Sequence, residues 1–339
     1  MYITDLAEES DETTSVDIHE QEVPSKHQQN SELITMNIHD ELTRVVQTNI
    51  DLIEWYKHNK HNLTTCDVAL GDHYVKRARS VQNPLTLMIS TDGKPMLKSS
   101  RSSLWPVMAV LVELPPPVRE YESNTILLAL WHSVVTPDAN VLLASVIEQL
   151  AVLKAGGLNV HLQERGTTKF DIDIQLCGGD LPARSKCNKL NSHNGFYSCT
   201  KCLLKGEKCR HCNRMLYKYK DFQKLRVKDR TQEHINACVR LIEKKNNKNY
   251  KPFGVIAKSA LSDVISIPNQ SVYDYFHLCL EIHVNFLLTQ WSLSLQKADI
   301  VQSDDFPKCP VQNRSQARII FESCRKTIEF CKLALLHFF

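Results

Sequence analysis

Apolar positions along the chain follow first a helical period and then a strand period. Between residues 40 and 80 they recur near helical spacing, which predicts a helical segment. A short apolar run from Pro84 ends in the turn dipeptide Asp92-Gly93 and predicts a strand that delivers an acid to a turn. Two further apolar runs predict strands at residues 103–114 and 126–131.

Proline and glycine mark the ends of the elements that follow. The triple proline at 115–117 ends the second strand, because proline cannot join a central ladder. A helix opens at Asp138 and runs to about Lys154, where a glycine pair stops it. A short strand is predicted at residues 158–162. Residues 170–177 alternate apolar with polar and predict another strand, which ends at a second glycine pair.

The order of these elements predicts an α/β fold with a mixed sheet. A strand with an acid at its end, two more strands, a helix and a second strand with an acid form the plan of an RNase H-like nuclease core. The two acids are Asp92 and Asp180. Carboxylates on adjacent strands can share divalent ions roughly 4 Å apart, which polarise a phosphodiester and activate its nucleophile. Magnesium needs only a few protein carboxylates beside water and substrate phosphate. Asp92 and Asp180 are therefore the candidate catalytic residues.

Composition divides the 339-residue chain into segments. Apolar residues are 42% and charged residues 23%, as in globular proteins, and the net charge of +3 indicates no partner. Residues 1–38 are acidic and polar, which predicts a disordered tail. We divide the remainder into a helical segment at 39–80, the RNase H-like core at 81–184, a basic, cysteine-rich, mostly helical insertion at 185–260 and a helical C-terminal segment at 261–339.

Lysine and arginine dominate the stretch from Arg184 to Lys258, with aromatic residues between them. A basic surface of this kind suits a phosphate backbone, and a solvated face without a ligand is the alternative interpretation. The candidate nucleic-acid contacts are Lys98, Arg184, Lys201, Lys205, Arg210 and Arg214. The start of the chain has no signal-peptide pattern, and no apolar stretch of roughly 18 residues predicts a membrane span.

Four of the twelve cysteines form two Cys-x-x-Cys pairs, Cys199 with Cys202 and Cys209 with Cys212. Clustered cysteines without a secretory signal favour metal binding over disulfides. Zinc prefers four nitrogen or sulfur ligands in a tetrahedron. The two pairs could form one local site, or the first pair could combine with ligands from elsewhere in the chain. Reduced thiols without a metal are the third alternative.

Ordered sequence blocks carry a family resemblance. They are Ser90-Thr-Asp92-Gly-Lys-Pro-Met-Leu-Lys98-Ser-Ser100, Ser103-Leu-Trp-Pro106, Glu113-Leu-Pro-Pro116, residues 124–131, Pro137-Asp138-Ala-Asn140, Asp180-Leu-Pro-Ala-Arg184, Asn194-Gly-Phe-Tyr-Ser-Cys199-Thr-Lys-Cys202 and Tyr273-Asp274-Tyr-Phe-His277. Together they resemble the catalytic core of CACTA-type (En/Spm-like) DNA transposases. Each block is weak alone, but the blocks keep the family's order from about residue 80 to about residue 292, where the match is lost.

The resemblance implies a nuclear, DNA-binding transposase that uses magnesium or manganese when active. Asp92 and Asp180 correspond to the first two of its three acids. The third lies in a Trp-Lys-Ala-x-Glu stretch, which does not follow Trp291 here. Glu322 and Glu329 are acids in a helix-like tail without matching context. We therefore expect a truncated or degenerate transposase-derived protein whose DNA cleavage and strand transfer are impaired.

The resemblance also implies a structural zinc ion held by the first cysteine pair with His277 and a fourth ligand, for which Asp274 is the candidate. The alternative ligands are Cys209, Cys212 and His283. A zinc-stabilised interaction module without nuclease activity is the alternative function. Whether the chain forms a homo-oligomer is left open.

Overall fold

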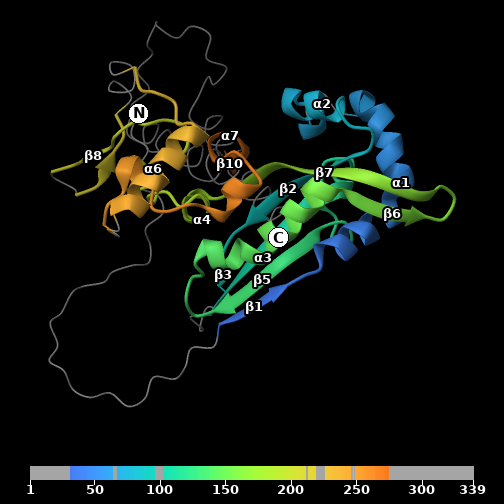
Figure 1. Cartoon of the computed structure of the whole chain (residues 1–339), viewed down its shortest axis with the longest axis horizontal. Helices are drawn as coiled ribbons and strands as arrows, with labels where there is room; N and C mark the ends of the chain where they lie inside the picture. Colours follow the sequence, from blue (N-terminus) through green and yellow to red (C-terminus); the bar gives the residue numbers. More distant parts are fainter. Residues whose placement is uncertain are drawn as a thin grey trace, which may run out of the picture. The chain divides into compact units, whose positions relative to one another are not determined.

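A computed structural model describes residues 31–63, 67–95, 102–210, 213–218, 226–245, 247 and 249–274. They form a mixed α/β fold around a strongly curled mixed sheet (Figure 1). The strands are β1 (Glu32–Thr35), β2 (Pro84–Thr91), β3 (Lys94–Pro95), β4 (Ser103–Leu111), β5 (Ile126–Ser133), β6 (Leu158–Leu162), β7 (Gly166–Gly179), β8 (Glu207–Lys208), β9 (Met215–Leu216) and β10 (Ser271–Tyr273). The α-helices are α1 (Ile38–Leu63), α2 (Asp72–Ala78), α3 (Ala139–Gly156), α4 (Leu181–Cys187), α6 (Gln232–Lys245) and α7 (Ile267–Gln270).

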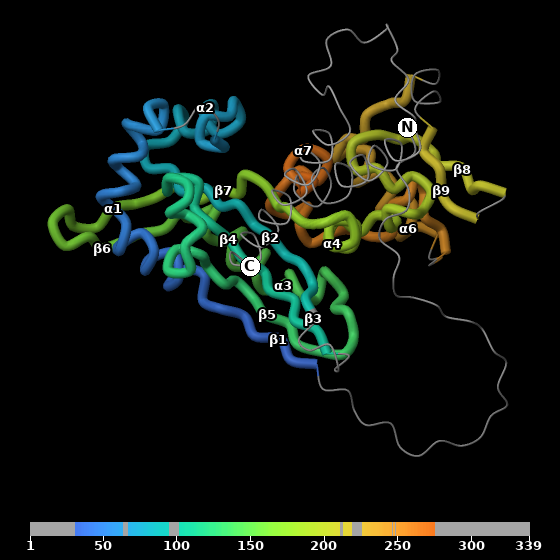
Figure 2. The backbone as a smooth tube through the Cα atoms, turned by 180° about the vertical axis from the view of Figure 1, so that it is seen from behind, coloured from blue at the N-terminus to red at the C-terminus, as the bar shows by residue number. Residues whose placement is uncertain are grey.

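Six strands pair in the order β1-β5-β4-β2-β7-β10, while β3 pairs with β4 and β6 with β7. Strands β2, β4 and β5 are antiparallel neighbours. Strand β7 is parallel to β2, and β10 is parallel to β7. Figure 2 shows β1, β5, β4 and β2 side by side from behind. The predicted mixed sheet is therefore confirmed.

The helix predicted from Asp138 forms as α3 and covers the sheet. Asp138 caps it by accepting a hydrogen bond from the Asn140 N–H at 2.8 Å, and Gly157 ends it with φ at 75°. That left-handed conformation favours glycine. The apolar stripe of α3 is buried in one core with α1 and the central strands (Leu142, Leu143, Val146, Ile147 and Leu150 from α3). Burying it against the sheet is the main stabilisation available to this helix.

Helix α3 is also, among the described residues, the one element long and apolar enough to cross a membrane by length and composition. Its packing fits a core helix, because its stripe contacts the sheet. The helix reaches this range by its mean hydropathy alone, because Asn140, Ser145, Glu148, Gln149 and Lys154 interrupt its apolar residues.

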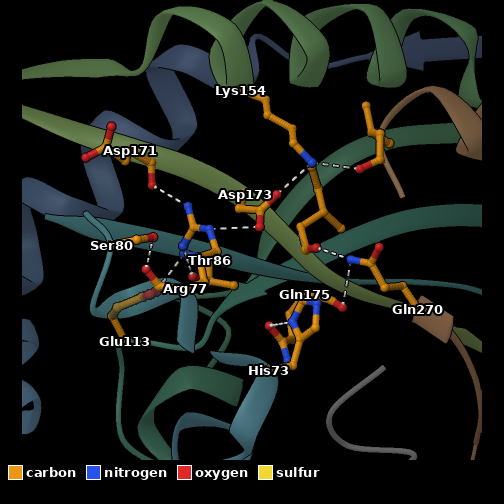
Figure 3. Close-up of polar contacts among 12 residues, drawn as sticks. His73, Arg77, Ser80, Thr86, Glu113, Lys154, Asp171, Asp173, Gln175 and Gln270 are labelled. Atoms are coloured by element: carbon orange, nitrogen blue, oxygen red, sulfur yellow. Dashed lines mark hydrogen bonds and ion pairs between the residues drawn. The ribbon is translucent and has the colours of Figure 1, made fainter. Parts of the chain in front are cut away.

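The alternation predicted for residues 170–177 is confirmed in β7. Phe170, Ile172 and Ile174 are buried, whereas Asp173 makes ion pairs. Figure 3 shows Arg77 of α2 and Lys154 of α3 reaching Asp173, with distances of 2.8 Å from Arg77 Nε and 2.7 Å from Lys154 Nζ. These pairs attach α2 and α3 to the strand that leads to the second candidate acid.

Three predicted boundaries are wrong. The tail was predicted to reach residue 38, but residues 32–35 form β1 on the edge of the sheet and α1 begins at Ile38. The second strand ends at Leu111 rather than at residue 114. The core does not close at residue 184, because β10 from beyond the insertion pairs with β7. Residues 1–30 lie outside the described part of the chain.

The insertion at 185–260 was predicted to be mostly helical, and its described residues are not. They contain the end of α4, the short hairpin β8–β9 and the single long helix α6, joined by irregular segments. A second small core holds this part together (Leu190, Ile235, Cys238, Val239, Val255 and Ile267). Of the C-terminal segment predicted to be helical, residues 261–274 form a 3₁₀ turn, α7 and β10. Residues 275–339 lie outside the described residues.

Candidate functional site

Asp92 and Asp180 lie at the same edge of the sheet. Asp92 follows β2 and Asp180 follows β7, and these strands are parallel neighbours. Their last pair in register is Ser90 with Gly178, so each acid stands two residues beyond a matched pair. Because the carboxyl ends of parallel neighbours meet at one edge, the structure brings the two predicted acids together in register. This edge also lies where open α/β sheets bind ligands.

The turn after β2 needs glycine beside Asp92. An added Cβ on Gly93 would lie 2.4 Å from the Trp105 indole, closer than any real contact. Trp105 is buried and fixed in β4, so it cannot give way. The Gly93 N–H donates to Asp92 Oδ1 at 2.7 Å. The Asp-Gly dipeptide therefore places Asp92 on a turn that closely contacts the tryptophan.

Asp180 is held by the start of α4. Its Oδ1 accepts a hydrogen bond from the Ala183 N–H at 2.7 Å, which is an N-cap contact. The preceding Gly179 is close to β2, since a Cβ there would lie 3.3 Å from the Thr91 carbonyl oxygen. The cap orients the carboxylate and leaves Oδ2 outside the capping bond. A carboxylate fixed in this way is preorganised for a metal ion.

The Trp105 side chain links the two acid-bearing segments. Its ring contacts Gly93 on one side of the site, and Lys186 of α4 places its Nζ 4.8 Å from the ring centroid. The turn that carries Asp92 and the helix capped by Asp180 thus share one indole. No three His, Cys, Asp or Glu residues gather as a metal site anywhere in the described part of the chain. Among the described residues, this edge of the sheet supplies two carboxylates, those of Asp92 and Asp180.

The first cysteine pair forms a tight turn. The Cys202 thiol donates a hydrogen bond to the Cys199 sulfur, which lowers the pKa of the Cys199 thiol well below its usual range. The Lys201 N–H also donates to Cys199 Sγ at 3.4 Å. Sulfurs held together and supported by backbone N–H groups have the geometry and chemistry of two zinc ligands.

Arg230 supports this turn from within. It is only 3% exposed, and its Nε donates to the Cys199 carbonyl oxygen at 3.1 Å. Its Nη2 donates to the carbonyl oxygens of Tyr197 and Phe253 at 3.0 Å each. A buried guanidinium thus fixes the backbone that carries the first thiol and adds positive charge near both thiols.

The remaining predicted zinc ligands are not gathered around the pair within the described residues. Cys209 stands in the β8–β9 hairpin, where its N–H donates to the Arg214 carbonyl at 2.7 Å. The hydroxyl of Tyr273 lies 4.0 Å from Cys199 Sγ, so the pair adjoins the end of β10, immediately before Asp274. Cys212, His277 and His283 lie outside the described residues.

The predicted nucleic-acid contacts fall into two groups. Lys205, Arg210 and Arg214 are exposed on the insertion, and Lys205 places its Nζ 5.8 Å from the Phe196 ring centroid. Lys201 is also exposed, but its ammonium donates to the Pro268 carbonyl. Arg184 is buried. Lys98 lies outside the described residues. The burial of Arg184 and the role of Arg230 were missed, because nothing in sequence separates a buried arginine from an exposed one.

A cavity of about 180 Å³ lies at the far end of β2 from Asp92, where it is lined by Pro84, Tyr74 and Glu113 together with residues of α1. Glu113 is buried, and its Oε2 accepts a hydrogen bond from the Thr86 N–H at 2.8 Å. Burial raises the pKa of Glu113 to about 7. The carboxyl group is therefore protonated in the fold at pH values where an exposed glutamate is ionised.

This shift predicts a pH-dependent stability. Because the folded-state pKa of Glu113 is above the ordinary 4.5 of the unfolded chain, the folded state holds an extra proton between these values. Stability from this group is complete below about pH 4.5 and is lost as pH rises through 7, by about 3 kcal/mol in all. We expect Glu113→Gln to remove this loss and to unfold at higher urea than wild type at pH 8. Glu122→Gln, the same change at an exposed position, should leave the pH profile unchanged. Equal profiles for wild type and Glu113→Gln would contradict the assignment.

The fold and its acid pair thus define a mixed α/β protein with two carboxylates at one edge of its sheet. The model of the family described as "Protein of unknown function (DUF1258)" matches residues 24–244, and the chain belongs to that family. Comparison with curated proteins found no match. The family match covers both acids, the first cysteine pair and the hairpin.

Proposed function

We propose that this chain is a transposase-derived nucleic-acid-binding protein with an RNase H-like core, acting on DNA in the nucleus. The observation that carries the proposal is the sheet. An antiparallel β2-β4-β5 meander, the helix α3, and then β7 parallel to β2 and β10 parallel to β7 follow the RNase H-like plan. The acids follow β2 and β7, which are parallel neighbours inside the sheet.

The proposal includes binding with impaired cleavage. Two-metal phosphodiester chemistry needs ligands that hold both ions on either side of the scissile phosphate. Asp92 and Asp180 supply one carboxylate each, and Glu322 and Glu329 lie outside the described residues. With no acid in the third position of the transposase pattern, bound magnesium or manganese would be held by the two aspartates, water and substrate phosphate. The chain would then still bind DNA but would carry out strand transfer inefficiently.

A structural zinc ion is the second part of the proposal. Cys199 and Cys202 fit zinc as described, and the contact with Tyr273 favours ligands beyond β10 over a site made of the two cysteine pairs alone. Such an ion would connect the insertion to the strand that completes the sheet. Exposed lysine and arginine side chains on the insertion would then lie on a fixed surface for phosphate groups.

DNA binding across a salt series tests the function. We expect the full chain to bind a fluorescein-labelled DNA duplex with an affinity that falls steeply as KCl rises, because phosphate contacts release counterions. Fluorescence anisotropy measures this dependence. An affinity that ignores salt, or no binding, would instead favour a zinc-stabilised interaction module.

The same preparation tests the acids. With manganese, any nicking of supercoiled plasmid should be slow and should disappear in Asp92→Asn and in Asp180→Asn, while both variants keep wild-type DNA affinity. Glu122→Asn is the matched control, because it changes an exposed acid that is distant in sequence from both Asp92 and Asp180. Rapid cleavage by the wild-type chain would overturn the impaired-cleavage part of the proposal.

A further inference from the structure

Arg184 combines burial with missing partners. Its side chain belongs to α4, one turn after Asp180, and the residue is 5% exposed. Nε and Nη2 are buried and have no hydrogen-bond partner among the described residues. The guanidinium carbon lies 3.4 Å from the centroid of the Tyr273 ring. The face of the guanidinium therefore stacks on an aromatic ring, while the donors on Nε and Nη2 have no acceptor among the described residues.

No carboxylate within the described residues forms an ion pair with Arg184. An arginine buried without a partner is costly to the fold. Groups that destabilise the free protein in this way are typical of binding sites.

The position of Arg184 indicates what it binds. Asp180, the capping residue of the same short helix, is at the edge of the sheet with Asp92. An anion there would neutralise Arg184. Guanidinium groups bind phosphate oxygens with two parallel N–H donors, and stacking on an aromatic ring leaves those edge donors available.

We propose that Arg184, stacked on Tyr273, is the group that binds a phosphodiester of the DNA next to the Asp92–Asp180 edge. The inference rests on the proposed function and narrows it to one phosphate contact. It makes Arg184 different in kind from the exposed basic residues of the insertion. Those residues contribute to affinity along the backbone, whereas Arg184 sets where a phosphate lies relative to the acids.

The test compares stability with affinity in one variant. Arg184→Met keeps the length of the side chain and removes the charge. We expect DNA affinity about 10-fold below wild type and a salt slope smaller by about one. We also expect thermal stability without DNA to equal or exceed that of wild type, because an unpaired buried charge has been removed. A purely structural arginine would give the opposite result, with lower stability and unchanged affinity.

Two further variants sharpen the comparison. Arg184→Lys keeps the charge but cannot donate two parallel N–H groups, so its affinity should fall between those of wild type and Arg184→Met. Lys244→Met makes the same change in charge at an exposed position of α6 and should lower affinity less than twofold.

The outcomes separate the inference from the function. If the wild-type chain shows no salt-dependent affinity for DNA, the proposed function fails and the inference fails with it. If wild type binds DNA and Arg184→Met binds equally well with the same salt slope, only the inference fails. A strongly destabilised Arg184→Met would also overturn it, because a carboxylate of the chain would then already neutralise the guanidinium.

Discussion

Purified protein carrying Cys199→Ser is expected to contain no zinc, whereas the wild-type chain should contain about one ion per molecule. Serine keeps the shape of the side chain but removes the thiolate that zinc requires. Free energies of zinc binding in small structural sites are on the order of 10 kcal/mol, and that energy contributes directly to folding. The insertion should therefore lose its ordered structure with the metal. Elemental analysis and limited proteolysis measure the two effects.

The small core of the insertion explains why the effect should be large. The cluster around Leu190, Ile235 and Val255 contains few buried side chains, compared with the core of the main sheet. Arg230 donates hydrogen bonds to carbonyl groups of the turn that carries Cys199. These bonds are lost when the turn unfolds, so Arg230 cannot hold the turn in place of the metal. Cores as small as this one usually need a metal ion or a disulfide to fold.

Control variants identify the ligands. Cys238→Ser changes a buried cysteine of α6, whose sulfur lies 3.9 Å from His234 Nε2, and should retain zinc. Loss of zinc in His277→Ala supports ligands beyond β10. Loss of zinc only in a Cys209→Ser, Cys212→Ser double variant would support the local four-cysteine site. Well-folded wild-type protein without zinc would contradict both.

Much of the sheet could be predicted because local sequence patterns mark its strands. The run from Pro84, the alternation at 170–177 and the helix opened by Asp138 each follow from periodicity and end signals within about twenty residues. The plan of the core placed the two acids on adjacent strands, and the structure pairs these strands in parallel. The intervening helix belongs to the crossover that parallel neighbours need. The edge that carries both acids is consequently the most predictable part of the site.

The two edge strands could not be predicted in this way. β1 has mostly exposed side chains, including Leu33 and Ile34, so it lacks the alternation of a half-buried strand. β10 is three residues long and pairs with a strand that ends more than ninety residues earlier. Both depend on tertiary pairing rather than on local pattern. The stacking of Arg184 on Tyr273 could not be predicted for the same reason, because it joins a residue before the insertion to one after it.

The buried ion pair of Arg119 with Asp67 should give the largest stability effect outside the proposed zinc site. Arg119 Nη1 and Nη2 donate to the two carboxylate oxygens of Asp67 at 2.9 and 2.7 Å. The arginine also donates to the carbonyl oxygens of Leu114 and Val112, and the Tyr56 hydroxyl donates to Asp67. The side chains of Arg119 and Asp67 are 2% and 7% exposed, so water cannot replace either partner.

Arg119→Met should therefore lower the free energy of unfolding by about 3–5 kcal/mol, because it leaves a buried carboxylate without its cation. Burial alone would raise the pKa of Asp67, but the hydrogen bonds from Arg119 and Tyr56 outweigh it and lower that pKa. A lowered folded-state pKa stabilises the fold above the unfolded value and is lost as pH falls through the folded one. The deficit of Arg119→Met relative to wild type should thus shrink toward acid pH. Urea unfolding at several pH values measures this difference.

The double variant Arg119→Met, Asp67→Leu separates the unpaired charge from lost packing. Removing both charges from a buried pair is often close to neutral, so we expect it to recover more than half of the stability lost in Arg119→Met. Recovery would show that the cost lies in the isolated carboxylate. A double variant as unstable as the single one would instead assign the loss to the hydrogen bonds from Arg119 to Leu114 and Val112. Those bonds hold the segment after β4 where it turns away from the sheet, and their donors leave with the arginine in both variants.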